Sequence, residues 1–295
     1  MRRQKLDGVL LLDKPVGPSS SAVLQAVKRL LNADKAGHAG TLDPLASGLL
    51  PLLFGEATKF AQFGLDSVKE YRAAVRLGIA TDSGDAEGKI MERQPVSVDA
   101  SRLAQALARF RGTIEQVPPM HSALKHGGQP LYALARAGKT VERAVRSVTV
   151  HELELLERSE DAIHLRIRCS KGTYVRQIAV DLGLALGTVA HLAALRRTAV
   201  GAYRLDQAVA LDDLQALGEE SRLAWLLPPD SLLDGLPRMD LPAKLAERFL
   251  QGQAVPVQAG RPGPCRVYRD AGALLGVGEA GPGNELHPVR LLASG

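Results

Sequence analysis

The chain has 295 residues, of which 45% are hydrophobic and 23% are charged, and its formal net charge is +5. This length favours one large domain accompanied by a small one, and the composition permits a buried core. The basic excess suits a polyanionic partner, although many soluble enzymes are equally basic. An apolar run near the N-terminus ends at Asp13 and Lys14, so it is too short for a signal peptide or a membrane span.

The two cysteines, Cys169 and Cys265, lie far apart in the sequence and form neither a CxxC pair nor a metal-ligand spacing. This usage is typical of a reducing compartment, and we expect a cytoplasmic protein. Cys169 falls in a run where apolar and polar residues alternate, which predicts that its side chain is buried.

The first part of the chain alternates between apolar runs and glycine-rich loops. The run over 9–12 predicts a buried strand, and the serines at 19–21 can cap a helix that continues to Leu31. Residues 36–48 are rich in glycine and too irregular for a helix. The sequence then predicts a strand over 71–77, a tight acidic loop over 81–88 and a helix over 100–110.

Residues 120–147 form a basic segment with a single acidic residue, Glu142. Its basic residues are Lys125, Arg136, Lys139, Arg143 and Arg146. Two interpretations remain open. The segment is either a solvated basic face or an arm that grips the phosphates of a nucleic acid.

The second part of the chain begins with a strand over 163–169, where apolar residues alternate with basic ones. A helix is predicted over 176–186. The chain turns proline-rich between 230 and 241, and we place a domain boundary there, between domains of residues 1–235 and 236–295. The second domain is rich in glycine, proline and valine, which predicts a small β-rich unit.

The loop over 37–48 holds a lone acid, Asp43, which Pro44 follows directly. A proline keeps the preceding residue out of the helical conformation and fixes the turn that presents the acid. Leu42 and Leu45 flank the acid, and an ionised carboxylate in an apolar pocket is costly unless a cation or hydrogen bonds hold it. Asp43 is therefore either a functional acid with a partner or an ordinary Asp-Pro turn residue.

Arg176 lies in the first turn of the helix predicted after the glycine turn in CSKGTYVR. A basic residue there opposes the helix dipole, which indicates that it serves a partner; a solvated arginine is the alternative. The chain has no GxxxxGK[ST], HExxH or GxSxG motif, and no GxGxxG at a predicted strand–helix junction. The acids Asp82, Asp85 and Glu87 lack the remaining ligands of an EF-hand, so we expect no metal site.

Three segments together resemble the bacterial tRNA pseudouridine-55 synthases of the TruB type: GVLLLDKPVGPSSS, GHAGTLDPLASGLLP and CSKGTYVRQIAVDLG. The central loop alone would also fit the guide-RNA-dependent synthases. KEYRAAVRLGIATDSGDAEG and PPMHSALKHGGQPLYALARAG narrow the resemblance to the stand-alone bacterial type. It implies an α+β fold in which helices flank a central mixed, mainly antiparallel sheet, with a small C-terminal β-rich domain of the PUA-like type.

The resemblance also implies roles for three catalytic residues. Asp43 matches the aspartate that attacks the uridine nucleotide as a nucleophile. Arg176 matches the arginine that pairs with this aspartate and keeps it ionised. Tyr71 matches the tyrosine that stacks on the target base, and we further expect it to assist removal of the C5 proton.

Four further residues match positions that bind the substrate. Tyr174 matches an active-site tyrosine, and Leu195 matches an apolar wall of the uracil pocket. His38 matches the histidine that fills the space left by extruded bases of the T-loop. Lys14 is expected close to the site.

The implied reaction breaks the N1–C1′ bond and joins C5 to C1′, and because nothing enters or leaves overall, no cofactor and no metal are expected. The expected partner is the T-arm of tRNA, held by the basic segment, and we expect a monomer without an obligate protein partner or a membrane. Two alternatives remain. One is the catalytic subunit of a guide-RNA-dependent synthase, which the basic segment disfavours; the other is an RNA-binding or RNA-folding module.

Overall fold

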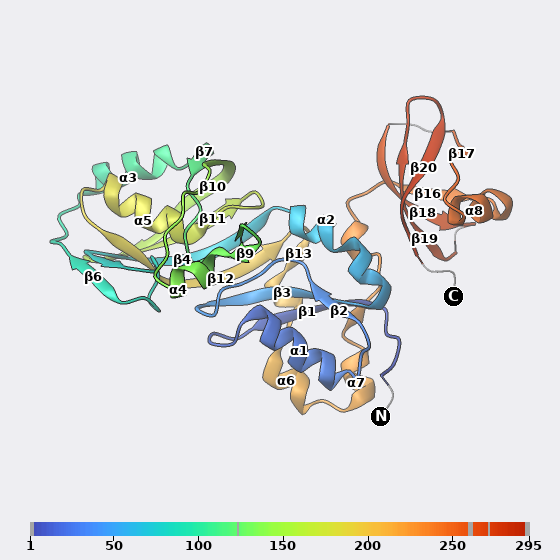
Figure 1. Ribbon diagram of the computed structural model, residues 1–295, viewed down its shortest axis with the longest axis horizontal. Helices are drawn as coiled ribbons and strands as arrows, with labels where there is room; N and C mark the ends of the chain where they lie inside the picture. Colours follow the sequence, from blue (N-terminus) through green and yellow to red (C-terminus); the bar gives the residue numbers. More distant parts are fainter. Residues whose placement is uncertain (1–2, 123, 259–261, 271, 293–295) are drawn as a thin grey trace.

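The computed structural model describes residues 3–122, 124–258, 262–270 and 272–292 (Figure 1). Eleven strands form its main sheet, with the path β14-β1-β3-β12-β4-β11-β10-β7; β13, β15 and β2 pair with β12, β1 and β3. The strands are β1 (Gly8–Lys14), β2 (Ala36–His38), β3 (Ala46–Phe54), β4 (Lys69–Leu77), β7 (Gly112–Gln116), β10 (Arg146–Arg158), β11 (Ala162–Cys169), β12 (Ala190–Val200), β13 (Tyr203–Arg204), β14 (Val209–Ala210) and β15 (Leu226–Leu227).

Two pairings in the main sheet are parallel, β1 with β14 and β3 with β12, and the other pairings described are antiparallel. The sheet is therefore mixed and mainly antiparallel, as predicted. Alternation along β11 is also confirmed, because Ile163, Leu165, Ile167 and Cys169 are buried. The basic residues between them lie on the opposite face of the strand.

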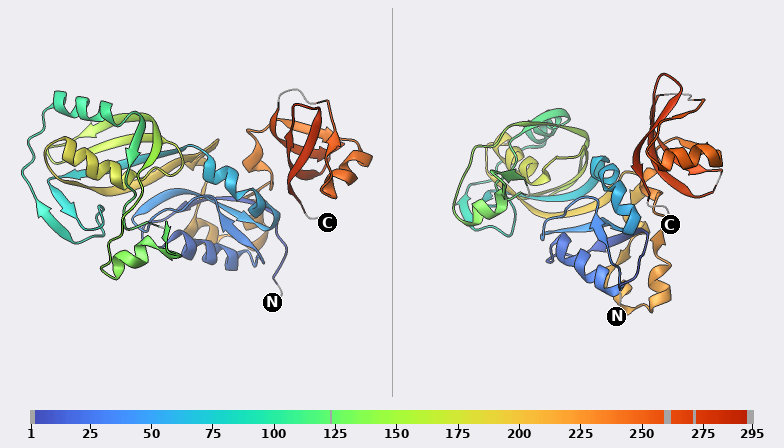
Figure 2. Two further views of the ribbon diagram at one scale, coloured as in Figure 1. Left: turned by 45° about the horizontal axis from the view of Figure 1, so that its top comes forward. Right: turned by 45° about the vertical axis from the view of Figure 1, so that its right-hand side comes forward.

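Helices cover the main sheet in two groups (Figure 1, Figure 2). One core joins α1 (Ser20–Leu30) and α6 (Leu211–Ala216) to β1 and β3. A second core joins α3 (Ala100–Arg109) and α5 (Val175–Ala185) to β4, β10 and β11. Tyr71 and Leu195 pack against both cores, so the boundary between the two groups passes these side chains.

The three predicted helices are confirmed, and Ser19 caps α1 by accepting a hydrogen bond from the amide of Ala22. No helix occurs over 36–48, as predicted, but the loop expected over 37–48 is shorter, because the strand β2 and the start of β3 occupy its two ends. Gly37 pairs with Leu53 through the backbone, and such pairing needs no pattern of side chains.

Two insertions lie beside the α5 half of the sheet. A hairpin of β5 (Ile79–Thr81) and β6 (Ile90–Arg93) holds the acidic loop. The basic segment contains β8 (Lys125–His126), β9 (Gln129–Pro130) and α4 (Leu131–Arg136). The shorter elements are η1 (Gly55–Phe60), α2 (Ala61–Asp66), η2 (Leu205–Gln207), α7 (Glu219–Leu223) and η3 (Ser231–Leu233).

A second sheet of five strands lies at the C-terminal end of the chain, in the order β16-β18-β19-β20-β17. Its elements are β16 (Arg238–Leu241), α8 (Ala243–Leu250), β17 (Val255–Pro256), β18 (Gly263–Arg269), β19 (Leu274–Ala280) and β20 (Glu285–Leu291). This unit has a core of its own, as the predicted β-rich domain requires.

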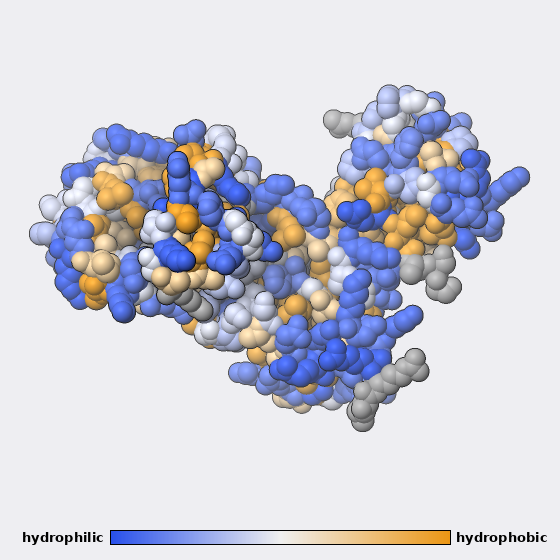
Figure 3. Space-filling model, in the orientation of Figure 1, coloured by the Kyte–Doolittle hydropathy of each residue, from blue (hydrophilic) through white to orange (hydrophobic). Residues whose placement is uncertain are grey.

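The C-terminal unit meets the rest of the chain through an apolar cluster. Phe60, Leu233 and Val277 are buried together there, and Lys59 Nζ donates to the carbonyl of Leu291 at 2.9 Å. Hydrophilic residues cover much of the face seen in Figure 3, with smaller apolar areas between them. No helix in the described ranges has the length and apolar character needed to cross a membrane.

Candidate active site

The loop between β2 and β3 presents Asp43, and hydrogen bonds to its backbone fix it to the start of α1 and the turn before it. Ser20, which is buried, accepts a hydrogen bond from the Leu42 amide at 2.8 Å and donates one to the Leu42 carbonyl at 2.9 Å. Gly17 donates to the carbonyl of Pro44 at 2.8 Å. The residues on both sides of Asp43 are therefore held in place independently of its carboxylate.

Lys14, at the end of β1, supports this loop from inside the protein. Its side chain is fully buried, and Nζ donates to the carbonyls of Ala46 at 2.7 Å and Pro15 at 2.8 Å. Burial lowers the pKa of Lys14 to about 8, although the negative charge of Asp43 acts in the opposite direction. Lys14 is thus close to Asp43, as expected, but behind the loop.

Arg176, the second residue of α5, forms ion pairs with two aspartates. Its Nη2 contacts Oδ2 of Asp43, and its Nε lies 2.9 Å from Oδ2 of Asp85. Its Nη1 also donates to the carbonyl of His121 at 2.9 Å. The structure thus contains the pairing of Asp43 with Arg176 that the resemblance implied. The two carboxylates also compensate for the unfavourable position of a positive charge at the start of a helix.

Asp85 was not predicted as part of the site. Its side chain is 4% exposed, and Oδ1 accepts hydrogen bonds from Ser83 Oγ at 2.6 Å and from the Glu87 amide at 3.1 Å. Gly84, at φ +76°, lets this loop approach α5, because a Cβ there would lie 3.4 Å from Cγ of Arg176. The sequence feature that could have indicated Asp85 is the segment TDSGDAEG, an acidic loop with a glycine before its central acid.

The expectation that Asp43 lies in an apolar pocket needs correction. The Asp43 side chain is 46% exposed, whereas those of Arg176 and Asp85 are 7% and 4% exposed. The buried ion pair is therefore Arg176 with Asp85, and Asp43 occupies the solvent-facing side of the arginine. A carboxylate in this position is accessible to a large ligand.

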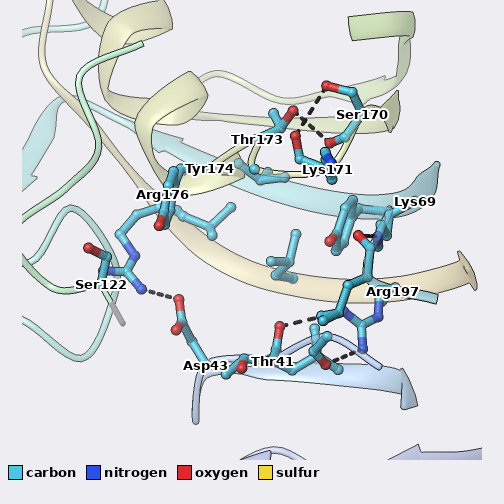
Figure 4. A pocket seen from close by; sticks show the side chains of 18 residues that line it. Thr41, Asp43, Lys69, Ser122, Ser170, Lys171, Thr173, Tyr174, Arg176 and Arg197 are labelled. Carbon is cyan, nitrogen blue, oxygen red and sulfur yellow. Dashed lines mark hydrogen bonds and ion pairs between the residues drawn. The ribbon is translucent and has the colours of Figure 1, made fainter. Parts of the chain in front are cut away.

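A cavity of about 290 Å³ lies beside Asp43 (Figure 4). Asp43, Tyr71, Tyr174, Arg176 and Leu195 all line it, so five of the seven predicted site residues come together. Burial raises the pKa of Tyr71 and of Tyr174, which favours their neutral phenols. Apolar walls with an ion pair at one end suit a flat, uncharged, polar ring.

A second cavity, of about 450 Å³, lies on the other side of the Asp43–Arg176 pair. Thr41, Leu42, Asp43, Ser122 and Arg176 line both cavities, so these residues separate them. The hairpin loop contributes Asp85 and Glu87, and the basic segment contributes His121 and Tyr132. The basic segment therefore reaches the ion pair directly.

His38 lies on β2 and is absent from the described lining of both cavities. Its Nδ1 is buried and makes no hydrogen bond, and burial lowers the pKa of the imidazole. The ring is thus held neutral near the Asp43 loop. No cluster of His, Cys, Asp and Glu side chains in the described parts of the chain is arranged to hold a metal ion.

The fold places the chain among the pseudouridine synthases. A chain of a Cbf5–Nop10–Gar1 complex matches with 29% sequence identity and a TM-score of 0.73, covering 92% of this chain and 78% of its own. A chain of an H/ACA RNP bound to a substrate RNA containing 2′-deoxyuridine matches with 26% identity and a TM-score of 0.73, covering 97% and 85%.

Sequence comparison narrows the class to one family. The model of the TruB family pseudouridylate synthase N-terminal domain matches residues 28–175. The tRNA pseudouridylate synthase B C-terminal domain matches 176–234, and the pseudouridine synthase II TruB C-terminal model matches 237–292. The chain belongs to the TruB family of pseudouridylate synthases.

Curated relatives match almost the whole chain. The tRNA pseudouridine synthase B of Aromatoleum aromaticum is 54% identical over 99% of this chain and 95% of its own length. The protein of the same name from Dechloromonas aromatica is 52% identical over 98% and 96%. That from Burkholderia mallei is 53% identical over the full length of both chains.

Proposed function

We propose that this protein is a stand-alone tRNA pseudouridine synthase that isomerises the T-loop uridine-55 of tRNA. The observation that carries the proposal is the Asp43–Arg176 pair at the wall of a cavity lined by Tyr71, Tyr174 and Leu195. The relatives named tRNA pseudouridine synthase B, at 52–54% identity over nearly the full chain, support the same activity. The expected RNA partner and the enzyme class follow from this likeness.

Asp43 acts as the nucleophile. Its partly exposed carboxylate is accessible to a nucleotide, and the guanidinium of Arg176 orients it. A covalent intermediate divides one difficult step into two easier ones. The N1–C1′ bond breaks, the uracil turns, and the C5–C1′ bond forms; C5 releases a proton and N1 gains one, so the atoms balance without a cofactor.

The uracil enters the cavity beside Asp43. Extruding a base from its stack costs a few kcal/mol. The ring of Tyr71 can return about 1–3 kcal/mol by stacking, while Leu195 and Tyr174 form the other walls. His38 fills the space that the base leaves in the T-loop, and Lys14 holds the Asp43 loop from behind.

The remaining parts of the chain bind the rest of the tRNA. Residues 1–235 form the catalytic domain, and the PUA-like unit of residues 236–295 gives a second RNA contact. The basic segment of residues 120–147 clamps the T-arm through exposed cations such as Lys125, Lys139 and Arg146. The side chain of Arg136 lies outside the described part, and Arg143 donates to the Pro118 carbonyl instead. The enzyme acts in the cytoplasm as a monomer without an obligate protein partner.

The guide-RNA-dependent alternative has weaker support. The solved complexes that share the fold are only 25–29% identical to this chain. A segment of its own for holding the substrate also favours a self-sufficient enzyme. A protein that only binds or folds RNA would not require the Asp43–Arg176 pair.

Release of tritium from uridine C5 tests the proposal. The protein is given transcribed tRNA that carries tritium at C5 of every uridine, with a matched transcript in which cytidine replaces the T-loop uridine. Release approaching one uridine equivalent from the first transcript and none from the second is expected. Equal release from both transcripts, or none from either, would contradict the proposal.

A further inference from the structure

Arg197, on β12, is the largest fully buried residue in the described part of the chain. It is 1% exposed, and no described carboxylate lies within ion-pairing distance of it. Burial lowers the pKa of its guanidinium, so the charge is held in an unfavourable place. A buried cation without a counter-ion is costly, and its hydrogen-bond acceptors must compensate for the lost water.

The acceptors of Arg197 lie on both sides of Asp43 along the chain. Nε donates to the carbonyl of Leu49 at 2.7 Å, after the loop. Nη2 donates to the carbonyl of Gly40 at 3.1 Å, and Nη1 lies 3.5 Å from that of Thr41, both in the part of the loop that precedes Asp43. The guanidinium therefore joins the two ends of the loop.

The same guanidinium acts on the hydroxyl of Tyr71, whose pKa it lowers against the effect of burial. Arg197 and Tyr71 are cross-strand partners on β12 and β4, and both line the cavity. Cys169 and Asp43 are the other titratable groups that act on this hydroxyl. Figure 4 shows Arg197 and Arg176 at opposite ends of the cavity, so Arg197 has no part in the Asp43 ion pair.

We propose that Arg197 is a positioning residue of the reaction, which fixes the Tyr71 hydroxyl relative to the loop that presents Asp43. This inference rests on the proposed function. A guanidinium suits the task because its planar donors serve several acceptors at fixed angles, whereas a lysine ammonium is a single flexible point charge. Lysine in this place keeps the charge but cannot hold the loop and the hydroxyl together.

The test compares steady-state tritium release by the wild type, Arg197→Lys, Tyr71→Phe and the double variant. Arg196→Lys is the matched control, because the neighbouring Arg196 points to the other face of β12 and pairs with Asp13. Arg197→Lys should lower kcat about 10- to 100-fold and leave KM within about twofold, because the stacking ring remains while the hydroxyl is misplaced. Arg196→Lys should retain wild-type kcat.

Coupling between the two residues decides the inference. In the Tyr71→Phe background, Arg197→Lys should cost less than about threefold, because the hydroxyl it positions is already gone. An equal loss in both backgrounds, or no loss in either, would overturn the inference. The wild type must release tritium in the same assay; if it does not, the proposed function itself fails.

A stability measurement covers the case in which Arg197→Lys does not fold. If Arg197 holds the hydroxyl as the inference states, Tyr71→Phe in the wild-type background removes an acceptor from a buried donor. Its thermal midpoint should fall by about 2–4 °C relative to the wild type. An unchanged or raised midpoint would mean that the hydroxyl and the guanidinium are not bonded, and it would overturn the inference.

Discussion

Asp43 and Asp85 pair with the same arginine, yet they should contribute very differently to the free energy of unfolding. Asp85 is 4% exposed, so Asp85→Ala leaves the buried Arg176 guanidinium without its buried counter-ion. Breaking such a pair costs about 3–5 kcal/mol. The upper half of this range is expected, because Ser83 Oγ and the Glu87 amide also lose their acceptor. Asp43 is 46% exposed, and Asp43→Ala should cost about 0–1 kcal/mol.

Urea unfolding, followed by far-ultraviolet circular dichroism at neutral pH, measures both differences. The Asp85→Ala midpoint should fall clearly, with an unchanged slope, while the Asp43→Ala midpoint should stay near that of the wild type. Asp85→Asn should lie between them, because the amide oxygen still accepts a hydrogen bond. A loss for Asp43→Ala as large as that for Asp85→Ala would refute the assignment of Asp85 as the buried partner.

Three further predictions concern the loop support and the RNA contact. Burial lowers the pKa of Lys14 from its ordinary value of 10.5 to about 8. Between these two pH values the unfolded chain keeps a proton that the folded chain has released, so the contribution of Lys14 to stability rises with pH. Lys14→Met should reduce the rise in unfolding free energy between about pH 7.5 and about pH 9.5; an identical rise would contradict the pKa. Gly48→Ala should lower the free energy of unfolding by at least about 3 kcal/mol, because φ is +102° and a Cβ would lie 2.3 Å from the Arg197 carbonyl oxygen. Gly218→Ala is the control, since a Cβ there meets open space, and it should leave thermal unfolding nearly unchanged. Lys139→Glu and Arg146→Glu should each reduce the slope of log Kd for tRNA against log salt by about 1; unchanged slopes would remove the basic segment from the interface.

The sequence predicted the strands β1, β4 and β11 of the main sheet and the helices α1, α3 and α5, because their side chains follow the pattern of the element. The alternation of Ile163, Leu165 and Ile167 and the serine cap of α1 are clear examples. The short strands β8 and β9 and the helix α4 were missed, because they are too short to build a period. β2 was missed because its backbone pairs with β3 while its residues, Ala36 to His38, carry no strand pattern.

The site was predicted in part for a different physical reason. Local sequence left open whether Asp43 is a functional acid or a turn residue and whether Arg176 serves a partner or is solvated, and only the resemblance paired them. Asp85 was missed because its role depends on the packing of the hairpin loop against α5. No local sequence pattern predicts such a contact. Arg197 could have been found, since alternation from Leu195 places it on the cavity face of β12 and Arg196 on the other.

The most direct measurement of the central claim compares tritium release by Asp43→Asn with that of the wild type, at enzyme excess over the labelled tRNA. The substitution keeps the size of the side chain and removes its nucleophilic charge, while the rest of the cavity is unchanged. The variant should bind the tRNA with about the wild-type Kd and release no tritium from C5 within the time in which the wild type completes its turnover. Release by Asp43→Asn at a rate near that of the wild type would show that Asp43 is not the nucleophile.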